Sequence, residues 1–151
     1  MFRLARTGAV ALPLVFGGQA GAVEYMSADV LVQDITASIA GDNFTCAATI
    51  LTNGGGDDSA RNVTLVIVLP LEVKLLDRSP ACAPVSITGG TGTWTSHVVC
   101  KWASIARHSP QSVKIITTKS RHPRSKSCGA LIWNLVPDPD PANNSRSATA
   151  P

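Results

Sequence analysis

Short segments in which apolar and polar residues alternate are the feature that most constrains the fold of this chain. Residues 43–53 are the clearest example, because every second position carries an apolar side chain. These side chains belong to Phe44, Cys46, Ala48 and Ile50. A period of two places them on one face of a β-strand, and no segment keeps a helical period. The sequence therefore predicts an all-β protein.

Seven more segments have the composition of strands and are separated by glycine, proline or polar residues. They are residues 29–38, 62–69, 72–76, 97–105, 112–119, 128–136 and 145–149. Residues 62–69 are the most apolar, and we expect Pro70 to end that strand. The glycines and aspartates at 54–58 predict a turn. Short strands with such turns are typical of an all-β sandwich or barrel.

The first residues have the pattern of a secretory leader. Arg3 and Arg6 precede an apolar stretch at residues 7–18, which is too short to span a bilayer as a helix. Ala20, Gly21 and Ala22 then supply the small residues that a signal peptidase accepts. We expect residues 1–22 to be removed by cleavage after Ala22, so that the protein is secreted, either periplasmic or extracellular.

Removal of this leader leaves 129 of the 151 residues, enough for one domain with a sizeable core. We expect a short extension at residues 23–28 and a sandwich domain at 29–151, with no later segment able to span a membrane. The leader carries two of the 13 basic residues and none of the 10 acidic ones. The remaining chain is close to neutral, which argues against nucleic acid as a partner.

One basic cluster stands out between Ser120 and Lys126, where Arg121 and Arg124 also lie. A solvated loop between two strands is the main interpretation of this cluster. Contact with a polyanion or a surface glycan is the functional alternative, because clustered cations attract such partners.

Several segments resemble, in order, a bacterial surface repeat family of immunoglobulin-like domains. The segments are DVLVQDITAS, ILTNGG, ARNVTLVIVLP, SPAC, VVC, SPQSVKIITTK and PDPDPANNSRSATA, which together extend over residues 29–150. This family is a conserved repeat of unknown function and is similar to bacterial cell-adhesion-related domains. The resemblance implies an immunoglobulin-like antiparallel β-sandwich of about seven strands. It also implies a structural or adhesive role at the cell surface rather than an enzymatic one.

Four cysteines permit three disulfide pairings. The resemblance implies that Cys82 pairs with Cys100, because the family often carries a pair in this region. Cys46 and Cys128 then occupy the strands that an inter-sheet bridge joins in immunoglobulin domains. Both bridges are expected in an oxidising compartment. Metal binding is the competing use, but the chain contains no C-x-x-C pattern.

The proline-rich segment before the last strand predicts a stiff corner. Three prolines in residues 137–141 favour extended backbone, so we expect a strut that crosses from one sheet to the other. Asn143 and Asn144 then suit a tight turn. A calcium site formed by Asp138, Asp140 and Asn143 is the alternative, because oxygen ligands suit this cation.

No catalytic motif emerges from the sequence. The chain contains no nucleophile elbow, no paired-carboxylate motif and no phosphate loop, and the glycines at 89–92 precede no helical pattern. We therefore expect no enzyme, no catalytic residues and no cofactor. The alternative to an adhesion module is a small secreted binding protein for a metal ion or for carbohydrate, with Trp94, Trp102 and Trp133 as candidate platform residues.

The last predicted strand, residues 145–149, is short. We expect it to leave part of its neighbour's edge unpaired, and unpaired backbone groups are a template for an added strand. A partner chain, or residues 23–28 of another copy, would then add a strand at the C-terminal sheet edge.

Overall fold

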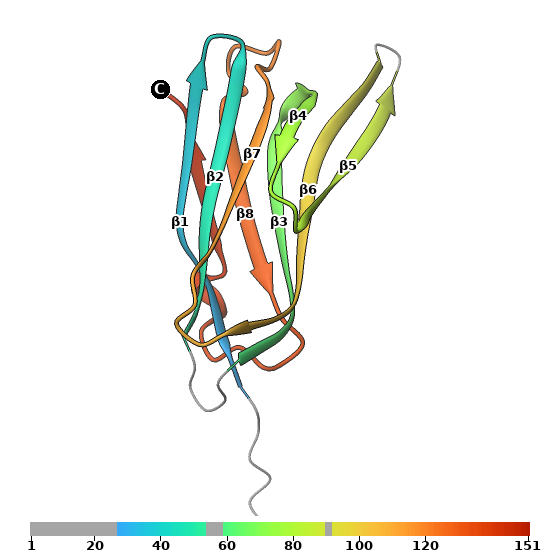
Figure 1. The fold of residues 1–151 in the computed structure, drawn as a ribbon. Coiled ribbons are helices and arrows are strands. Elements are labelled where there is room, and N and C mark those ends of the chain that lie inside the picture. The colour runs from blue at the N-terminus through green and yellow to red at the C-terminus, as the bar shows by residue number, and fades with distance from the viewer. Residues whose placement is uncertain (1–26, 54–58, 90–91) are drawn as a thin grey trace, which may run out of the picture.

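The computed structural model describes residues 27–53, 59–89 and 92–151, and Figure 1 shows them as two facing β-sheets. The strands are β1 (Asp29–Ala40), β2 (Asn43–Asn53), β3 (Ser59–Val73), β4 (Leu75–Arg78), β5 (Cys82–Gly89), β6 (Gly92–Ala106), β7 (Gln111–Thr118), β8 (Ser127–Trp133) and β9 (Ser145–Thr149). A single 3-10 turn, η1 (Pro141–Asn143), precedes β9. The all-β prediction is confirmed.

The strand order identifies an immunoglobulin-like sandwich. One sheet has the order β1-β2-β7-β4, the other has the order β5-β6-β3-β8-β9, and every pair is antiparallel. The first order corresponds to strands ABED of an immunoglobulin domain, and β3, β8 and β9 correspond to CFG. Strands β6 and β5 extend the second sheet beyond that pattern. The predicted sandwich is therefore confirmed, with an additional hairpin at one edge.

The core lies between the two sheets and is built by alternate residues of the central strands. The alternation predicted for β2 is observed, because Phe44, Cys46, Ala48 and Ile50 are all buried. Side chains of β3 and β8, from the other sheet, face them, and those of β7 lie beside them in the same core cluster. Burial of β-branched and aromatic side chains on one face of each strand is the main stabilising contribution in such a fold.

The two cysteine pairs lie at different places in this architecture. A disulfide with an Sγ–Sγ distance of 2.02 Å joins Cys46 of β2 to Cys128 of β8, and so links the two sheets. A second one, with an Sγ–Sγ distance of 2.08 Å, joins Cys82 of β5 to Cys100 of β6, at the base of their hairpin. Two disulfides fit a protein of an oxidising compartment.

The prediction that Pro70 ends the third strand is wrong. Strand β3 continues to Val73, but its pairing with β6 shifts register between Val68 and Val73. Within this irregular stretch Glu72 has a φ of 54°. Proline has no N–H to donate, so it is tolerated in a strand where the ladder is interrupted. After Lys74 the chain joins the other sheet as β4.

Strand β5 was not predicted from the sequence. It pairs with β6 from Cys82 opposite Cys100 to Gly89 opposite Gly92, so the two strands form a hairpin. Figure 1 shows this hairpin diverging from the body of the sandwich. The new strand β5 brings the described residues to nine strands, one more than the eight segments predicted from the sequence and above the about seven that the resemblance implied.

The proline-rich segment does not cross between the sheets, contrary to the prediction. It connects β8 to β9, which pair with each other in the five-stranded sheet. Its carboxylates and amides instead bind the start of β1. Val30 N–H donates to Asp138 Oδ2 at 3.3 Å, and Asn143 Nδ2 donates to Asp29 Oδ1 at 3.0 Å. The corner therefore ties the two sheets together without passing from one to the other.

The expectation that the short last strand leaves its neighbour unpaired is also wrong. Strand β9 is short, as predicted, yet it pairs with β8 from Ser127 to Leu131. The ladder continues at both ends, where Ala150 N–H donates to Lys126 O and Ile132 N–H donates to Asn144 O, both at 2.9 Å. The edge of β8 is therefore covered, and the outer side of β9 forms the sheet edge.

The predicted leader, its cleavage site at Ala22 and most of the extension at 23–28 lie outside the described residues. Among the residues that the structure does describe, no helix has the length and apolar character needed to cross a membrane.

Candidate functional site

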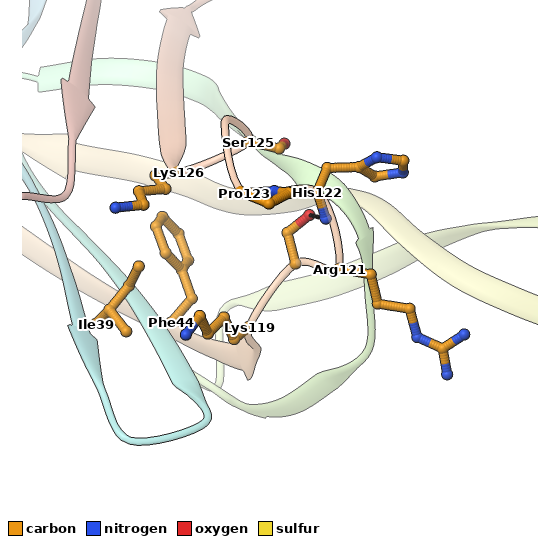
Figure 2. Close-up of a pocket in the computed structure, with 9 residues that line it drawn as sticks. Ile39, Phe44, Lys119, Arg121, His122, Pro123, Ser125 and Lys126 are labelled. Atoms are coloured by element: carbon orange, nitrogen blue, oxygen red, sulfur yellow. Dashed lines mark hydrogen bonds between the residues drawn. The ribbon is translucent and has the colours of Figure 1, made fainter.

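The β7–β8 loop forms a pocket at one end of the sandwich. This loop, residues 119–126, lies over Ile39 and Phe44, which flank the β1–β2 turn. The cavity has a volume of about 350 Å³. In Figure 2 the side chains of Lys119 and Lys126 lie on the same side as Phe44 and Ile39. The pocket thus combines an apolar floor with a cationic rim.

Two serine hydroxyls fix the loop to β3, one as a hydrogen-bond donor and the other as an acceptor. Ser120 Oγ donates to Leu71 O at 2.7 Å, and Leu71 N–H donates to Ser125 Oγ at 2.8 Å. Leu71 lies in the stretch after Pro70 where β3 leaves its ladder, so its backbone groups need other partners. Ser120 is buried and also accepts a hydrogen bond from His122 N–H at 3.1 Å. The irregularity of β3 therefore positions the basic loop.

In the part of the chain that the structure describes, no cation of this loop forms an ion pair with an aspartate or glutamate side chain apart from His122, and Lys126 Nζ donates to the oxygen of Pro151 at 3.4 Å. The lysines and arginines of the loop are Lys119, Arg121, Arg124 and Lys126. Within residues 27–53, 59–89 and 92–151, the only ion pair joins His122 Nε2 to Glu72 Oε2 at 3.4 Å. Asp42 lies in the adjacent β1–β2 turn, where its backbone carbonyl accepts from Lys119 N–H at 2.6 Å. The end of the sandwich around the loop consequently carries an excess of positive charge.

A second, more apolar groove lies next to the pocket, on the side of the β5–β6 hairpin. Its volume is about 320 Å³, and its apolar lining includes Leu71, Ile87 and Trp94. The Cζ atom of Arg121 lies 5.5 Å from the Trp94 ring centroid, and Lys74 Nζ lies at the same distance. Cations at this distance interact favourably with the indole ring. Arg121 thus borders both the pocket and the groove.

The three tryptophans do not form a common carbohydrate platform. Trp102 and Trp133 lie opposite Val63 and Thr64, which are successive residues of β3 and so point to opposite faces. Trp102 packs against the core, whereas Trp133 is 43% exposed. Only Trp94 lies beside the basic loop.

The structure gives no support to a metal site among the residues that it describes. No three histidine, cysteine, aspartate or glutamate side chains lie close enough to hold an ion. The Asp138 carboxylate accepts hydrogen bonds from Val30 N–H, Asp140 N–H and Asn144 Nδ2. Asn143 Nδ2 binds Asp29 and Asp140. The Asp138 and Asp140 carboxylates thus bind within the corner, whereas Asn143 Oδ1 is buried and has no hydrogen-bond partner among the described residues.

Several residues of the pocket had no local signal in the sequence. Lys119 precedes the predicted basic cluster and could have been added to it. Ile39 and Phe44 come from the opposite end of the chain, and only the sandwich fold brings them under the loop. The contact between Arg121 and Trp94 likewise joins residues that are far apart in the sequence.

No protein-family model and no curated protein matches this chain. An uncharacterised protein from Nocardia farcinica with an immunoglobulin-like fold aligns with 77% of this chain and 96% of its own, at 10% identity and a TM-score of 0.46. The chitin-binding domain of a Pyrococcus furiosus chitinase aligns with 74% and 99%, at 10% identity and 0.42. A cohesin module from Clostridium perfringens aligns with 84% and 97%, at 14% identity and 0.37. These similarities are too low to support a functional argument, and the fold rests on the strand order itself.

Proposed function

We propose that the protein is a secreted, non-enzymatic adhesion module that binds an anionic glycan through the pocket under the β7–β8 loop. The observation that carries this proposal is the set of four loop cations without a carboxylate side-chain partner among the described residues. A folded protein usually pairs or disperses such charges, because like charges repel each other. An anionic ligand would supply the missing partners.

The size and lining of the pocket favour a sugar residue that bears a carboxylate or sulfate group. A volume of about 350 Å³ is near the lower limit for small-molecule sites. Lys119 and Lys126 are placed to bind the acidic group, and the Ile39 and Phe44 floor offers an apolar surface to the C–H face of the ring. Arg121 beside Trp94 then provides a second cation for a neighbouring acidic sugar.

A hydrolytic role is not supported by the geometry of this site. Ser120, His122 and Glu72 are neighbours, and these residue types serve as nucleophile, base and orienting acid in some hydrolases. However, the Ser120 hydroxyl donates to the Leu71 carbonyl and accepts from the backbone of His122, not from its imidazole. Figure 2 shows the His122 side chain pointing away from the pocket. The serine is therefore part of the loop anchor.

Isothermal titration of the secreted protein with defined oligosaccharides tests the proposal. We expect binding to sulfated or uronic-acid oligosaccharides, no binding to neutral chitin oligosaccharides, and an affinity that falls with salt. The double variant Lys119→Gln/Lys126→Gln should lose about tenfold or more in affinity, since 1.4 kcal/mol corresponds to a factor of ten. Lys101→Gln/Lys114→Gln makes the same charge change away from the loop and should bind normally. Equal losses in both variants would contradict a specific site.

Secretion is part of the proposal and has its own measurement. Export with cleavage after Ala22 gives a mature chain that begins at Val23. Two disulfides then lower its mass by four hydrogens relative to the reduced chain. Intact-mass analysis with and without reduction checks both statements, and free thiols on Cys82 and Cys100 would contradict them.

Strand addition is a second candidate function, because the five-stranded sheet has open edges. Among the described strands, β9 at the C-terminal edge and β5 at the opposite edge each pair with one neighbour. An extended segment of a partner chain adds to such an edge through backbone hydrogen bonds.

A further inference from the structure

Strand β5 differs from the other three edge strands of the sandwich. Soluble proteins usually protect sheet edges with charges, bulges or very short strands. Strand β1 carries Asp29 and Asp34 and has a register shift beside Asp34. Strand β4 has four residues, including Asp77 and Arg78, and β9 has five. Strand β5 has eight residues and no charged side chain, and seven of the eight are exposed. Its pairing with β6 also shifts register, between Val85 and Ser86, but the extra residue is Ser96 of β6, so β5 itself keeps its alternation.

We infer that this edge is an assembly site, at which β5 pairs antiparallel with β5 of a second copy of the chain. The inference rests on strand addition, the second candidate function above, and is independent of the anion-binding pocket. Two-fold pairing joins the two five-stranded sheets into one continuous sheet, with the same surface contributed by each copy. An uncharged strand is suited to this arrangement, because no like charges meet across the two-fold axis.

The direction of the free backbone groups follows from the pairing with β6. Lys101 N–H donates to Ala81 O at 3.0 Å, so the groups of Ala81 face β6. Backbone groups along an antiparallel strand point alternately toward and away from the neighbour. Pro84, Ser86 and Thr88 therefore present their backbone groups to the open edge.

If the two copies are related by a two-fold axis at Ser86, nearly all of these outward backbone groups form hydrogen bonds between the copies. The two Ser86 residues exchange two N–H···O=C bonds, and Thr88 N–H of each copy donates to Pro84 C=O of the other. Proline lacks an N–H, so only the carbonyl of Thr88 stays without a bond from this ladder. Pro84 thus limits the length of the interface and disfavours an axis at Pro84 itself, which would place it in the middle of the ladder.

The side chains of the edge match this register. Val85 is 39% exposed and Ile87 is 59% exposed. Val85 lies opposite His97, and His97 lies opposite Val68, so these side chains share the outer face of the sheet. With the axis at Ser86, Val85 of one copy lies opposite Ile87 of the other. Such apolar cross-strand pairs stabilise an antiparallel ladder.

The disulfide at the base of the hairpin prepares the edge for this contact. Figure 1 shows β5 and the adjoining part of β6 diverging from the sandwich, so few other elements restrain them. The bond between Cys82 and Cys100 holds the two strands in register at the base. An edge that is already ordered loses less conformational entropy when it binds.

Sedimentation equilibrium of the secreted protein over its soluble concentration range tests the inference. One edge strand buries less than the roughly 1,200 Å² of a standard interface, so we expect a reversible, concentration-dependent dimer. Ser86→Pro removes the two central hydrogen bonds and should give a monomer. Ser147→Pro is the matched control. The backbone bonds of Ala150 to Lys126 and of Ile132 to Asn144 show which residues of the last strand face β8, and by alternation the Ser147 N–H points outward from β9. This control should dimerise normally.

Ile87→Lys provides a second route to the same answer if the proline variant misfolds. Its side chain is exposed, so the change leaves the β5–β6 ladder intact and places a charge at the edge. We expect it to be monomeric, with unchanged circular dichroism. A wild-type protein that stays monomeric at every soluble concentration overturns the inference. A dimer that persists in both β5 variants, or one that Ser147→Pro dissociates, overturns it as well.

Discussion

The two loops that flank β8 carry opposite charges and use them in opposite ways. The β8–β9 loop has the acidic side chains, and Asp138 accepts three hydrogen bonds from its surroundings. The β7–β8 loop has the basic side chains, and none of its lysines or arginines forms an ion pair with a described carboxylate. Because β8 separates them, these loops lie at opposite ends of the sandwich (Figure 1). At one end the Asp138 carboxylate is fully engaged, although Asn143 Oδ1 and Asn144 Oδ1 are buried there without a partner among the described residues, whereas the other end presents its charge to solvent.

The difference teaches that polar composition alone does not distinguish a structural loop from a binding loop. Both segments are rich in proline, serine or asparagine, and both look like connections between strands. The distinction lies in the backbone that each loop meets. The acidic loop meets free N–H groups at the start of β1, which suit carboxylates. The basic loop meets Leu71 through serine hydroxyls, and its lysines and arginines form no ion pair with a described carboxylate side chain.

The largest expected effect comes from the disulfide that links β8, the strand between the loops, to the other sheet. Cys46→Ala/Cys128→Ala should lower the free energy of unfolding by roughly 3–5 kcal/mol, because the bridge closes a long loop in the unfolded chain. The Cys82–Cys100 disulfide closes a shorter loop, with a sequence separation of 18 against 82, so Cys82→Ala/Cys100→Ala should lower the free energy of unfolding by less. Urea denaturation measures both. A larger loss in the hairpin variant would contradict the assignment of Cys46–Cys128 as the main covalent tie.

Removal of the acidic anchor should be the next largest effect. Asp138→Ala takes away the acceptor of Val30 N–H, Asp140 N–H and Asn144 Nδ2. We expect a loss of roughly 2–3 kcal/mol, since unpaired donors near the protein interior are costly. Asp140→Ala is the matched control, because this exposed residue accepts only from Asn143 Nδ2. A urea midpoint unchanged by Asp138→Ala would show that the corner does not anchor β1.

The strands that alternate cleanly could be predicted from the sequence, and those that depend on distant contacts could not. The buried face of β2 and the position of β9 follow from local pattern. Strand β5 was missed because its sequence is rich in small residues, and its neighbour β6 supplies the register. The continuation of β3 past Pro70 was missed because serines from the β7–β8 loop satisfy the freed groups of Leu71.

The candidate site was predictable only in part, for the same reason. The charges at Arg121, Arg124 and Lys126 are visible as a cluster in the sequence. The apolar floor is not visible, because the alternation of β2 marks Phe44 as a core residue without indicating that it also faces a pocket. Such contacts depend on how the β7–β8 loop packs against β1 and β2, and the local sequence pattern carries no information about this packing.

A smaller effect is expected from the anchor of the basic loop. Ser120→Ala should cost about 1–2 kcal/mol, because it leaves the Leu71 carbonyl and the His122 N–H without a partner at a buried site. It should also weaken oligosaccharide binding, since the loop then loses its fixed position. Ser109→Ala is a control in another loop, where the hydroxyl accepts only a long bond from Gln111. Normal binding by Ser120→Ala would show that the pocket does not depend on this anchor.

Substitution of the pocket lysines should have the smallest effect on stability. Comparing its effects on stability and on binding with those of Asp138→Ala distinguishes the two loops most clearly. Lys119→Gln/Lys126→Gln should change the free energy of unfolding by no more than about 0.5 kcal/mol, since neither lysine pairs with a described carboxylate side chain and Lys126 loses only a long, exposed bond to Pro151 O. Slight stabilisation is the expected sign, because the change relieves repulsion among four neighbouring cations. The same variant should lose oligosaccharide binding, whereas Asp138→Ala should lose stability and keep binding. Urea denaturation and titration of both variants measure the two properties together. If the lysine variant unfolds as easily as Asp138→Ala, the basic loop is structural and the contrast between the two ends of the sandwich is wrong.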